Sequence, residues 1–189
     1  MRKLKLQMQV TVDGFVSTGP VDEQKWVTWA WDEIKQEVLS RMESTDTIII
    51  GRKLAVDFIP YWERVAKNQQ DAMYELAIHN VRVRKIIFSK TLQKADWYNT
   101  EIATGDLVDE VNSFKRQPGN DIFVCGGSSF VSALTRHGLI DEYYFYINPV
   151  AIGNCDQIFN QINDFTQLKF LKSVAYPSGL VLIHYEQQR

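Results

Sequence analysis

Apolar and polar positions alternate at the start of the chain. The alternation covers five apolar positions: Leu4, Leu6, Met8, Val10 and Val12. A period of two residues is typical of a strand that buries one face. From Asp32 the spacing changes, because Ile34, Val38 and Met42 recur at the interval of an amphipathic helix. The pattern therefore predicts a strand followed by a helix.

Three short apolar runs come next, and each indicates a strand that is covered on both faces. They end near Gly51, Phe88 and Cys125. The segments between them predict a mostly helical stretch over 53–80 that is interrupted at Pro60, a short strand over 100–103, a helix from Asp106 to Pro118–Gly119, and a helix after Cys125 that stops at Gly138.

The last part of the chain predicts antiparallel strands. DEYYFYINPVAIG (141–153) is strand-like, and LKFLKSVAY (168–176) and GLVLIHYE (179–186) form a hairpin around Pro177–Gly179. Strands and helices alternate before this point, which predicts an α/β fold. We expect three αβα layers, with a mostly parallel central sheet and an antiparallel C-terminal hairpin. Because no repeat or linker interrupts the pattern, residues 1–189 are predicted to form a single domain.

Composition narrows the classes of partner. The net charge is −2 and the pI is about 5.9, so no global field favours nucleic acid or an anionic membrane. No stretch reaches the roughly 18 apolar residues that a membrane span needs, and the N-terminus lacks a signal-peptide core. The two cysteines have no metal-binding spacing. We expect a cytoplasmic protein without a metal, a nucleic-acid partner or a membrane partner.

Candidate chemistry lies where the three apolar runs end. The residues there are Gly51, Arg52 and Lys53, then Ser89, Lys90 and Thr91, and then Gly126, Gly127, Ser128 and Ser129. Ligands of parallel sheets gather at the carboxyl ends of the strands. The first and third ends lead into helices, whose opening amides and partial positive charge suit phosphate. Adjacent glycines let an anion approach the backbone and permit a positive φ angle.

Each of these features also has a structural interpretation. The glycine pair is compatible with a tight strand-to-helix turn, and charged residues often only flank a strand. The combination of three such ends with the cations Arg52, Lys53 and Lys90 favours a dinucleotide, which carries several phosphates. The GxGxxG fingerprint is absent, which argues against an ordinary Rossmann domain.

Four segments, in this order, resemble the dihydrofolate-reductase-like superfamily. They are TVDGFVS (11–17), TIIIGRK (47–53), IIFSKTL (86–92) and FVCGGSSFVSALTRHGLIDEYYFYINPVAIG (123–153). Within this superfamily, the chain is most similar to the reductase domain of bifunctional riboflavin-biosynthesis proteins and to its stand-alone bacterial relatives. The resemblance implies an NADPH-dependent reductase that is usually a homodimer.

The resemblance also assigns roles. Gly51–Lys53 and Ser89–Thr91 would hold the adenosine end of NADPH with its 2′-phosphate, and Gly126–Ser129 would hold the pyrophosphate. Asp13 matches an aspartate of the riboflavin branch, where it could orient a substrate or pass a proton; alternatively it caps a turn with Gly14. Asp32 lies near the place of the folate reductases' carboxylate. The chain departs from the folate reductases at Leu54, where they usually carry a threonine.

Three aromatic residues are candidates for stacking on a flat substrate: Trp29, Tyr61 and Trp62. Core or dimer contacts explain them equally well. The function predicted from the chain is hydride transfer from NADPH to a C=N or C=O bond of a small pterin- or pyrimidine-like heterocycle. Two alternatives stay open: a nucleotide-binding module without catalysis that acts as a sensor or partner-binding dimer, and a folded protein that binds no dinucleotide.

Overall fold

A computed structural model of the protein describes residues 1–19 and 22–188. The chain divides into two compact units. Unit 1 is Met1–Arg2 with Gln36–Gly127, and unit 2 is Lys3–Lys35 with Ser128–Arg189. Helix α1 (Trp31–Glu43) contains residues of both units. Whether the whole chain behaves as one domain stays a prediction.

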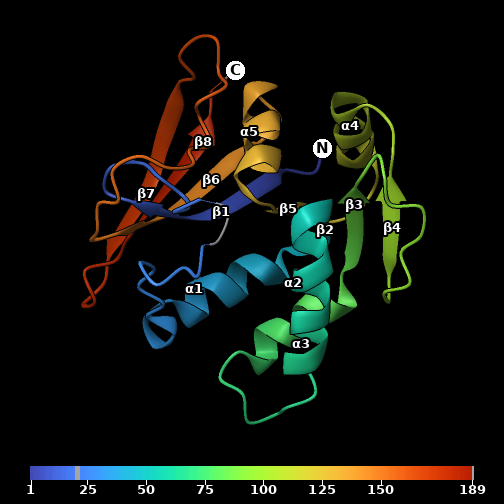
Figure 1. Cartoon of the computed structure of the whole chain (residues 1–189), viewed down its shortest axis with the longest axis horizontal. Helices are drawn as coiled ribbons and strands as arrows, with labels where there is room; N and C mark the ends of the chain where they lie inside the picture. Colours follow the sequence, from blue (N-terminus) through green and yellow to red (C-terminus); the bar gives the residue numbers. More distant parts are fainter. Residues whose placement is uncertain (20–21, 189) are drawn as a thin grey trace. The chain divides into compact units, whose positions relative to one another are not determined.

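Unit 1 contains four strands that run parallel to one another. Their order is β4-β3-β2-β5, and all three neighbouring pairs are parallel (Figure 1). The elements of unit 1 are β2 (Thr45–Gly51), α2 (Arg52–Val65), α3 (Tyr74–Arg82), β3 (Arg84–Phe88), β4 (Thr100–Ala103), α4 (Leu107–Arg116) and β5 (Asp121–Cys125).

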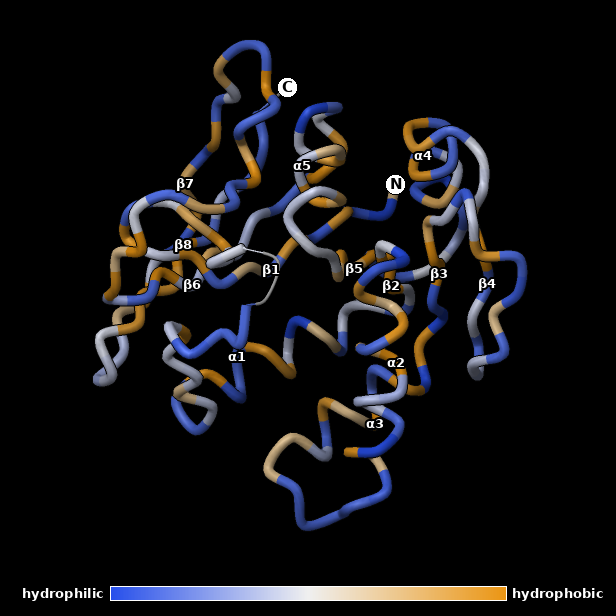
Figure 2. Tube along the Cα trace, viewed as in Figure 1, coloured by the Kyte–Doolittle hydropathy of each residue, from blue (hydrophilic) through white to orange (hydrophobic). Residues whose placement is uncertain are grey.

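The helices of unit 1 cover both faces of its strands. Phe88 on β3 contacts Phe114 of α4, with ring centroids 6.4 Å apart. Lys85 on the same strand donates to the carbonyls of Val81 and Val83 at the end of α3, at 2.8 and 2.9 Å. Because side chains alternate along a strand, α3 and α4 lie on opposite faces of β3. The prediction of strands covered on both faces is confirmed, and these strands carry hydrophobic stretches in Figure 2.

The expected break at Pro60 is wrong. Helix α2 continues through Pro60 as far as Val65. The break lies over 66–73, where a polar segment forms turns and the Asp71 side chain accepts from the Met73 amide at 2.8 Å. Proline removes one helical hydrogen bond, but α2 packs on α3, β2 and β3, and this tertiary packing holds the helix together.

Unit 2 contains the antiparallel part of the fold. Its strand order is β1-β6-β8-β7, in which β1 and β6 are parallel and the other two pairs are antiparallel. Its elements are β1 (Leu4–Thr11), α5 (Ser128–Arg136), β6 (Glu142–Asn148), β7 (Leu168–Ala175) and β8 (Val181–Gln187). Together the two units confirm the predicted α/β class, with mostly parallel strands and an antiparallel C-terminal hairpin.

Strand β1 differs from its prediction because its polar positions are buried as well. Lys5 is 8% exposed and Thr11 is 1% exposed, whereas Val12, just beyond the strand, is 63% exposed. In the register of the strand pair Lys5 lies opposite Glu142 on β6. The neighbouring strand, which is distant in sequence, therefore carries a charged residue next to Lys5, on the face that alternation alone marks as solvent-exposed.

Glu142 is the centre of a buried polar cluster in unit 2. Its carboxylate accepts from the Tyr144 hydroxyl at 2.7 Å and from the Lys3 ammonium at 2.6 Å, and His184 Nε2 lies 3.3 Å away. The His184 ring also stacks on Tyr144, with centroids 3.9 Å apart. Burial raises the pKa of Glu142, but the hydrogen bonds from His184, Lys3 and Tyr144 outweigh it and hold the pKa far below its ordinary value. Glu142 is therefore ionised throughout the neutral range.

Candidate active site: strand ends and loops

Three of the predicted cofactor segments meet at one edge of unit 1. In the strand register Gly51 lies opposite Phe88, and Ile50 lies opposite Cys125. The next residues along β3 and β5, Ser89 and Gly126, therefore follow on either side of the end of β2. Neighbouring strands lie about 4.8 Å apart, so the three ends form one continuous edge.

Helix α2 begins with charges that oppose its own dipole. Gly51 is its N-cap and makes no side-chain capping bond, and the first turn contains no acidic residue. Arg52 and Lys53 follow at the positive end of the helix, where cations are unfavourable. Both side chains are exposed and have no partner among the described residues. The arrangement leaves two cations and a set of amides available for an anion.

Helix α4 shows the usual arrangement for comparison. Asp106 caps it by accepting from the amides of Val108 at 2.8 Å and Asp109 at 3.2 Å, and the first turn carries further acidic residues. Helix α5, which starts at Ser128 in unit 2, again has no acidic residue in its first turn. The first turns of α2 and α5, which follow predicted phosphate-binding segments, thus contain no acidic residue, whereas the first turn of α4 does.

Ser89 holds the turn after β3. It is 8% exposed, and its hydroxyl accepts from the amides of Thr91 at 3.1 Å and Leu92 at 2.8 Å. Lys90 and Thr91 are exposed at the tip of this turn, and Lys90 has no partner in the part of the chain that the structure describes. A direct contact of Ser89 with a cofactor stays a prediction, whereas its role in presenting Lys90 follows from these bonds.

The glycine pair at the end of β5 leaves open space. A Cβ atom added to Gly127 would have no heavy atom within 4 Å. Neither Gly126 nor Gly127 is among the residues with positive φ, so the turn does not use the conformational freedom that the glycines permit. Close approach of a ligand to the backbone at these glycines stays a prediction.

Ser128 and Ser129 open helix α5 in unit 2. The Ser128 hydroxyl donates to Asp156 Oδ2 at 2.9 Å, a partner that the sequence analysis missed. A carboxylate therefore already engages this hydroxyl, and contact of Ser128 and Ser129 with a phosphate stays a prediction. Asp156 has no local sequence signal, since it lies in the irregular segment after β6 and meets Ser128 only in the folded unit.

Asp13 connects two segments of unit 2 by hydrogen bonds. Its carboxylate accepts from the Thr11 hydroxyl and from the amides of Ile152 at 3.0 Å and Gly153 at 2.8 Å. The hydrogen bonds from Thr11 and Gly153 lower the pKa of Asp13. A low pKa does not suit a proton donor at neutral pH. The geometry favours a structural role over proton transfer, and it joins two of the segments on which the family resemblance depends, TVDGF and NPVAIG.

The second predicted carboxylate, Asp32, lies in the first turn of α1, where it complements the helix dipole. It is exposed and has no partner in the described ranges 1–19 and 22–188. Its neighbour Glu33 accepts from the Ser178 hydroxyl at 2.7 Å, so Glu33 contributes to the fold of unit 2. Asp32 stays a prediction for the proton donor.

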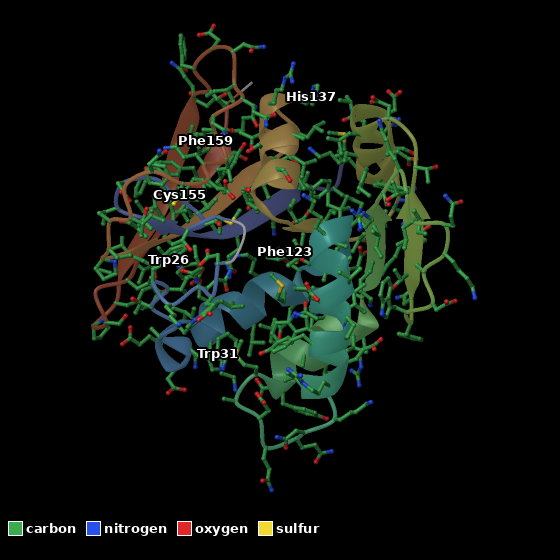
Figure 3. All side chains as sticks on the ribbon, in the orientation of Figure 1. Trp26, Trp31, Phe123, His137, Cys155 and Phe159 are labelled. Carbon is green, nitrogen blue, oxygen red and sulfur yellow. The ribbon has the colours of Figure 1, made fainter. Side chains whose placement is uncertain are left out.

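The predicted substrate-binding aromatics are partly exposed. Trp29 is 54% exposed in unit 2, before α1, in the segment that also carries Trp26 (Figure 3). In unit 1, Tyr61 is 43% exposed on α2, and Trp62 packs edge-on against Phe58 and Tyr61 with centroids 5.9 and 5.0 Å apart. Trp62 is thus part of the helix packing, whereas Trp29 and Tyr61 expose ring surface for a ligand or a partner.

Among the described residues, no group of three or more His, Cys, Asp or Glu side chains could hold a metal ion. None of the described helices is long and apolar enough to cross a membrane.

The fold and the order of its elements define an α/β protein of the dihydrofolate reductase type. The family model of the RibD C-terminal domain matches residues 2–182, and the chain therefore belongs to the RibD C-terminal domain family. It is 32% identical over 188 residues to "Uncharacterized protein YyaP" of Bacillus subtilis (strain 168), covering 97% of this chain and 94% of that protein.

Solved structures agree with this membership at the level of the fold. A protein from Shewanella sp. PV-4 named after riboflavin biosynthesis has a TM-score of 0.75 at 16% identity, with 99% of each chain covered. The diaminohydroxyphosphoribosylaminopyrimidine deaminase/5-amino-6-(5-phosphoribosylamino)uracil reductase of Thermotoga maritima has a TM-score of 0.69 at 14% identity, over 99% of this chain and 57% of that one. Dihydrofolate reductase from Enterococcus faecalis, complexed with NADP(H), has a TM-score of 0.57 at 12% identity, over 99% and 97%. The resemblance to the dihydrofolate-reductase-like superfamily is confirmed.

Proposed function

We propose that this protein is an NADPH-dependent reductase that transfers hydride to a C=N or C=O bond of a small pterin- or pyrimidine-like heterocycle. The observation that carries the proposal is the edge of unit 1, where Gly51–Arg52, Ser89–Lys90 and Gly126–Gly127 end three neighbouring parallel strands. Membership of the RibD C-terminal domain family supports a reductase-type function. The structural relatives named for a uracil reductase and for dihydrofolate reductase support a heterocyclic substrate.

The residues at this edge fit a phosphorylated dinucleotide. Arg52, Lys53 and Lys90 are exposed and have no partner among the described residues, so they can pair with a 2′-phosphate without breaking an existing ion pair. The open space at Gly127 lets a pyrophosphate reach the amides of the 126–129 segment. The bound cofactor would supply the hydride, and the protein would supply binding and orientation.

The proposal must also name a side chain that could donate the proton. Asp13 is ionised and held by three hydrogen bonds, so it would hold its loop in place rather than donate a proton. Asp32 is the remaining carboxylate of the prediction, and exposed Trp29 and Tyr61 would each offer a ring to a flat substrate.

Calorimetry with NADPH and a turnover assay test the proposal together. We expect saturable binding of NADPH that is tighter than that of NADH, and loss of absorbance at 340 nm with at least one member of a panel of pterins, folates and riboflavin precursors. NADPH at a hundred times its Kd should also stabilise the fold by about 2.7 kcal/mol. Absence of NADPH binding would contradict the proposal.

A second candidate function is a nucleotide-binding module without catalysis. The observation in its favour concerns Asp13, one of the two predicted acids: its hydrogen bonds lower its pKa, which does not suit a proton donor. In that case NADPH would bind saturably, and none of the panel would be reduced.

We also propose that the protein forms a homodimer through β7. In the strand order of unit 2 this strand lies at the end, and it exposes Phe170 at 57% and Leu171 at 39%. Phe170 also packs edge-on against Tyr185 of β8, with centroids 6.1 Å apart. Exposed apolar side chains on an edge strand are typical of pairing surfaces. Sedimentation of Leu171→Lys should give a monomer where the wild type gives a dimer; a monomeric wild type would contradict the proposal.

A further inference from the structure

Unit 1 has a second polar surface, at the amino ends of the strands whose carboxyl ends carry the predicted cofactor residues. It is an open hollow of about 500 Å³, a size that is common for small-ligand sites. Thr47 of β2 and Arg84 at the start of β3 line it, together with His79 and Arg82 from the last turn of α3. All of these residues belong to unit 1.

On one wall of the hollow the charged side chains already pair with each other. Arg2 is 6% exposed, and its guanidinium donates to the Asp46 carboxylate and to the Thr47 hydroxyl, the latter at 2.7 Å. Asp46 also accepts from the Asn120 amide at 2.7 Å. The charges of Arg2 and Asp46 therefore cancel, and this wall contributes shape rather than free charge.

Arg84 and Arg82, which also line the hollow, present unused donors. Arg84 donates from Nε to Glu101 and from Nη1 to Gln117 at 2.8 Å, and its Nη2 has no acceptor among the described residues. The Arg82 side chain is exposed and likewise has no partner in the part of the chain that the structure describes. Two guanidinium groups thus face solvent at the same hollow with donors to spare, which is the arrangement that binds phosphate and carboxylate.

His79 adds an unsatisfied buried atom. Its Nε2 is shielded from solvent and has no hydrogen-bond partner among the described residues, and a buried polar atom without a partner costs free energy. Burial lowers the pKa of His79, and nearby Glu43 acts in the opposite direction. A neutral imidazole nitrogen can donate or accept, depending on its tautomer. His79 lines the hollow, and a small turn of its ring would bring this nitrogen within reach of a ligand there.

Glu43 restricts which ligand fits. It lines the same hollow, is exposed, and has no ion-pair partner among the described residues. A carboxylate at this position repels a second anion and attracts an ammonium or hydroxyl group. The hollow is therefore complementary to a molecule that is anionic at one end only.

We propose that this hollow is a binding site for a small molecule with an oxyanion, phosphate or carboxylate, at one end and a cationic or hydroxyl group at the other. Arg82 and Arg84 hold the oxyanion, and His79 and Glu43 meet the other end. The site is independent of NADPH binding, since it uses none of the residues assigned to the cofactor.

Phosphoethanolamine, inorganic phosphate and ethanolamine are suitable probes, because they carry both ends, the anion alone and the cation alone. Binding is followed at constant ionic strength by NMR of the histidine ring resonances. The chain has only three histidines, and His79→Gln identifies the signal of His79. We expect the His79 signal to shift and saturate with phosphoethanolamine, and to respond more weakly to phosphate and to ethanolamine.

Arg82→Gln should weaken phosphoethanolamine binding about tenfold, since a hydrogen bond to a charged group is worth at least one order of magnitude in affinity. Arg136→Gln is the matched control, because Arg136 is also exposed in the last turn of its helix, and we expect it to leave the affinity unchanged. His79→Phe should weaken binding without lowering the stability of the free protein. Equal losses in Arg82→Gln and Arg136→Gln, or no shift of His79 with any probe, would overturn the proposal.

Discussion

The two units use their charged side chains in different ways. In unit 1, Arg52, Lys53 and Lys90 are exposed at strand ends and have no partner among the described residues. In unit 2, Asp13 and Glu142 each accept several hydrogen bonds, and at least one donor of each is distant in sequence. Unpaired cations contribute little to folding, whereas hydrogen-bonded carboxylates contribute directly. Substitutions in the first set should therefore change binding, and substitutions in the second set should change stability.

The largest expected effect is on binding in unit 1. Gly127→Val should weaken NADPH binding roughly 100-fold, because a branched side chain would fill the space through which a phosphate reaches the amides. The fold has room for the side chain, so stability should change by less than about 0.5 kcal/mol. Calorimetry and urea unfolding measure the two effects. Gly127→Ala is the graded control, with an intermediate loss; unchanged affinity in Gly127→Val would contradict the proposed phosphate site.

The next effect is on stability in unit 2. Glu142→Gln should lower the free energy of unfolding by about 2 kcal/mol at pH 7, because it removes a charge that accepts from Lys3 and Tyr144. Glu186→Gln is the control, since Glu186 contacts the same lysine at 3.1 Å but is more exposed, and its loss should stay below about 1 kcal/mol. NADPH affinity should be unchanged in both variants.

The pH dependence of the Glu142 effect has a definite sign. The folded pKa lies below the ordinary value of 4.5, so the stabilisation is fully present above pH 4.5 and is lost as the pH falls further. The difference between wild type and Glu142→Gln in urea unfolding should therefore shrink from pH 7 to pH 3. A difference that grows on acidification would show that Glu142 is not held as a carboxylate.

A smaller effect should distinguish the two nicotinamide cofactors. Lys90→Ala should weaken NADPH binding about tenfold, or 1.4 kcal/mol, and leave NADH binding unchanged, because only NADPH carries the 2′-phosphate. Lys67→Ala is the control; it removes an equally exposed lysine in the loop between α2 and α3. If Lys90→Ala weakens NADPH and NADH equally, Lys90 does not contact the 2′-phosphate.

The smallest expected change in turnover concerns Asp13. If Asp13 passed a proton, Asp13→Asn would reduce the rate roughly 10²–10⁴-fold. We expect a change of less than about tenfold, together with a lower melting temperature, since Asn keeps one acceptor for the amides of 152 and 153 but loses the charge that they stabilise. Turnover at fixed saturating substrate and a thermal unfolding scan separate the two outcomes. A large loss of rate with an unchanged melting temperature would give Asp13 a catalytic role.

The sequence by itself determined most of the secondary structure and the location of the candidate cofactor edge. Strand β4 spans Thr100–Ala103 as predicted, and Asp106 caps α4. These features depend on local periodicity and capping, which a few neighbouring residues decide. The strand ends meet because parallel strands place their carboxyl ends at one edge. Apolar runs followed by Gly, Ser or Lys were therefore sufficient to predict the candidate cofactor edge.

Only the tertiary structure decided which of these side chains are already engaged. Asp13 finds its amide partners 139 and 140 positions away, Lys5 faces Glu142 across a strand pair, and packing carries α2 through Pro60. The hollow lined by His79 and Arg82 brings together residues near the amino ends of different strands. Hydrogen bonds and burial depend on distance in space, and a local pattern contains no information about partners that are distant in sequence.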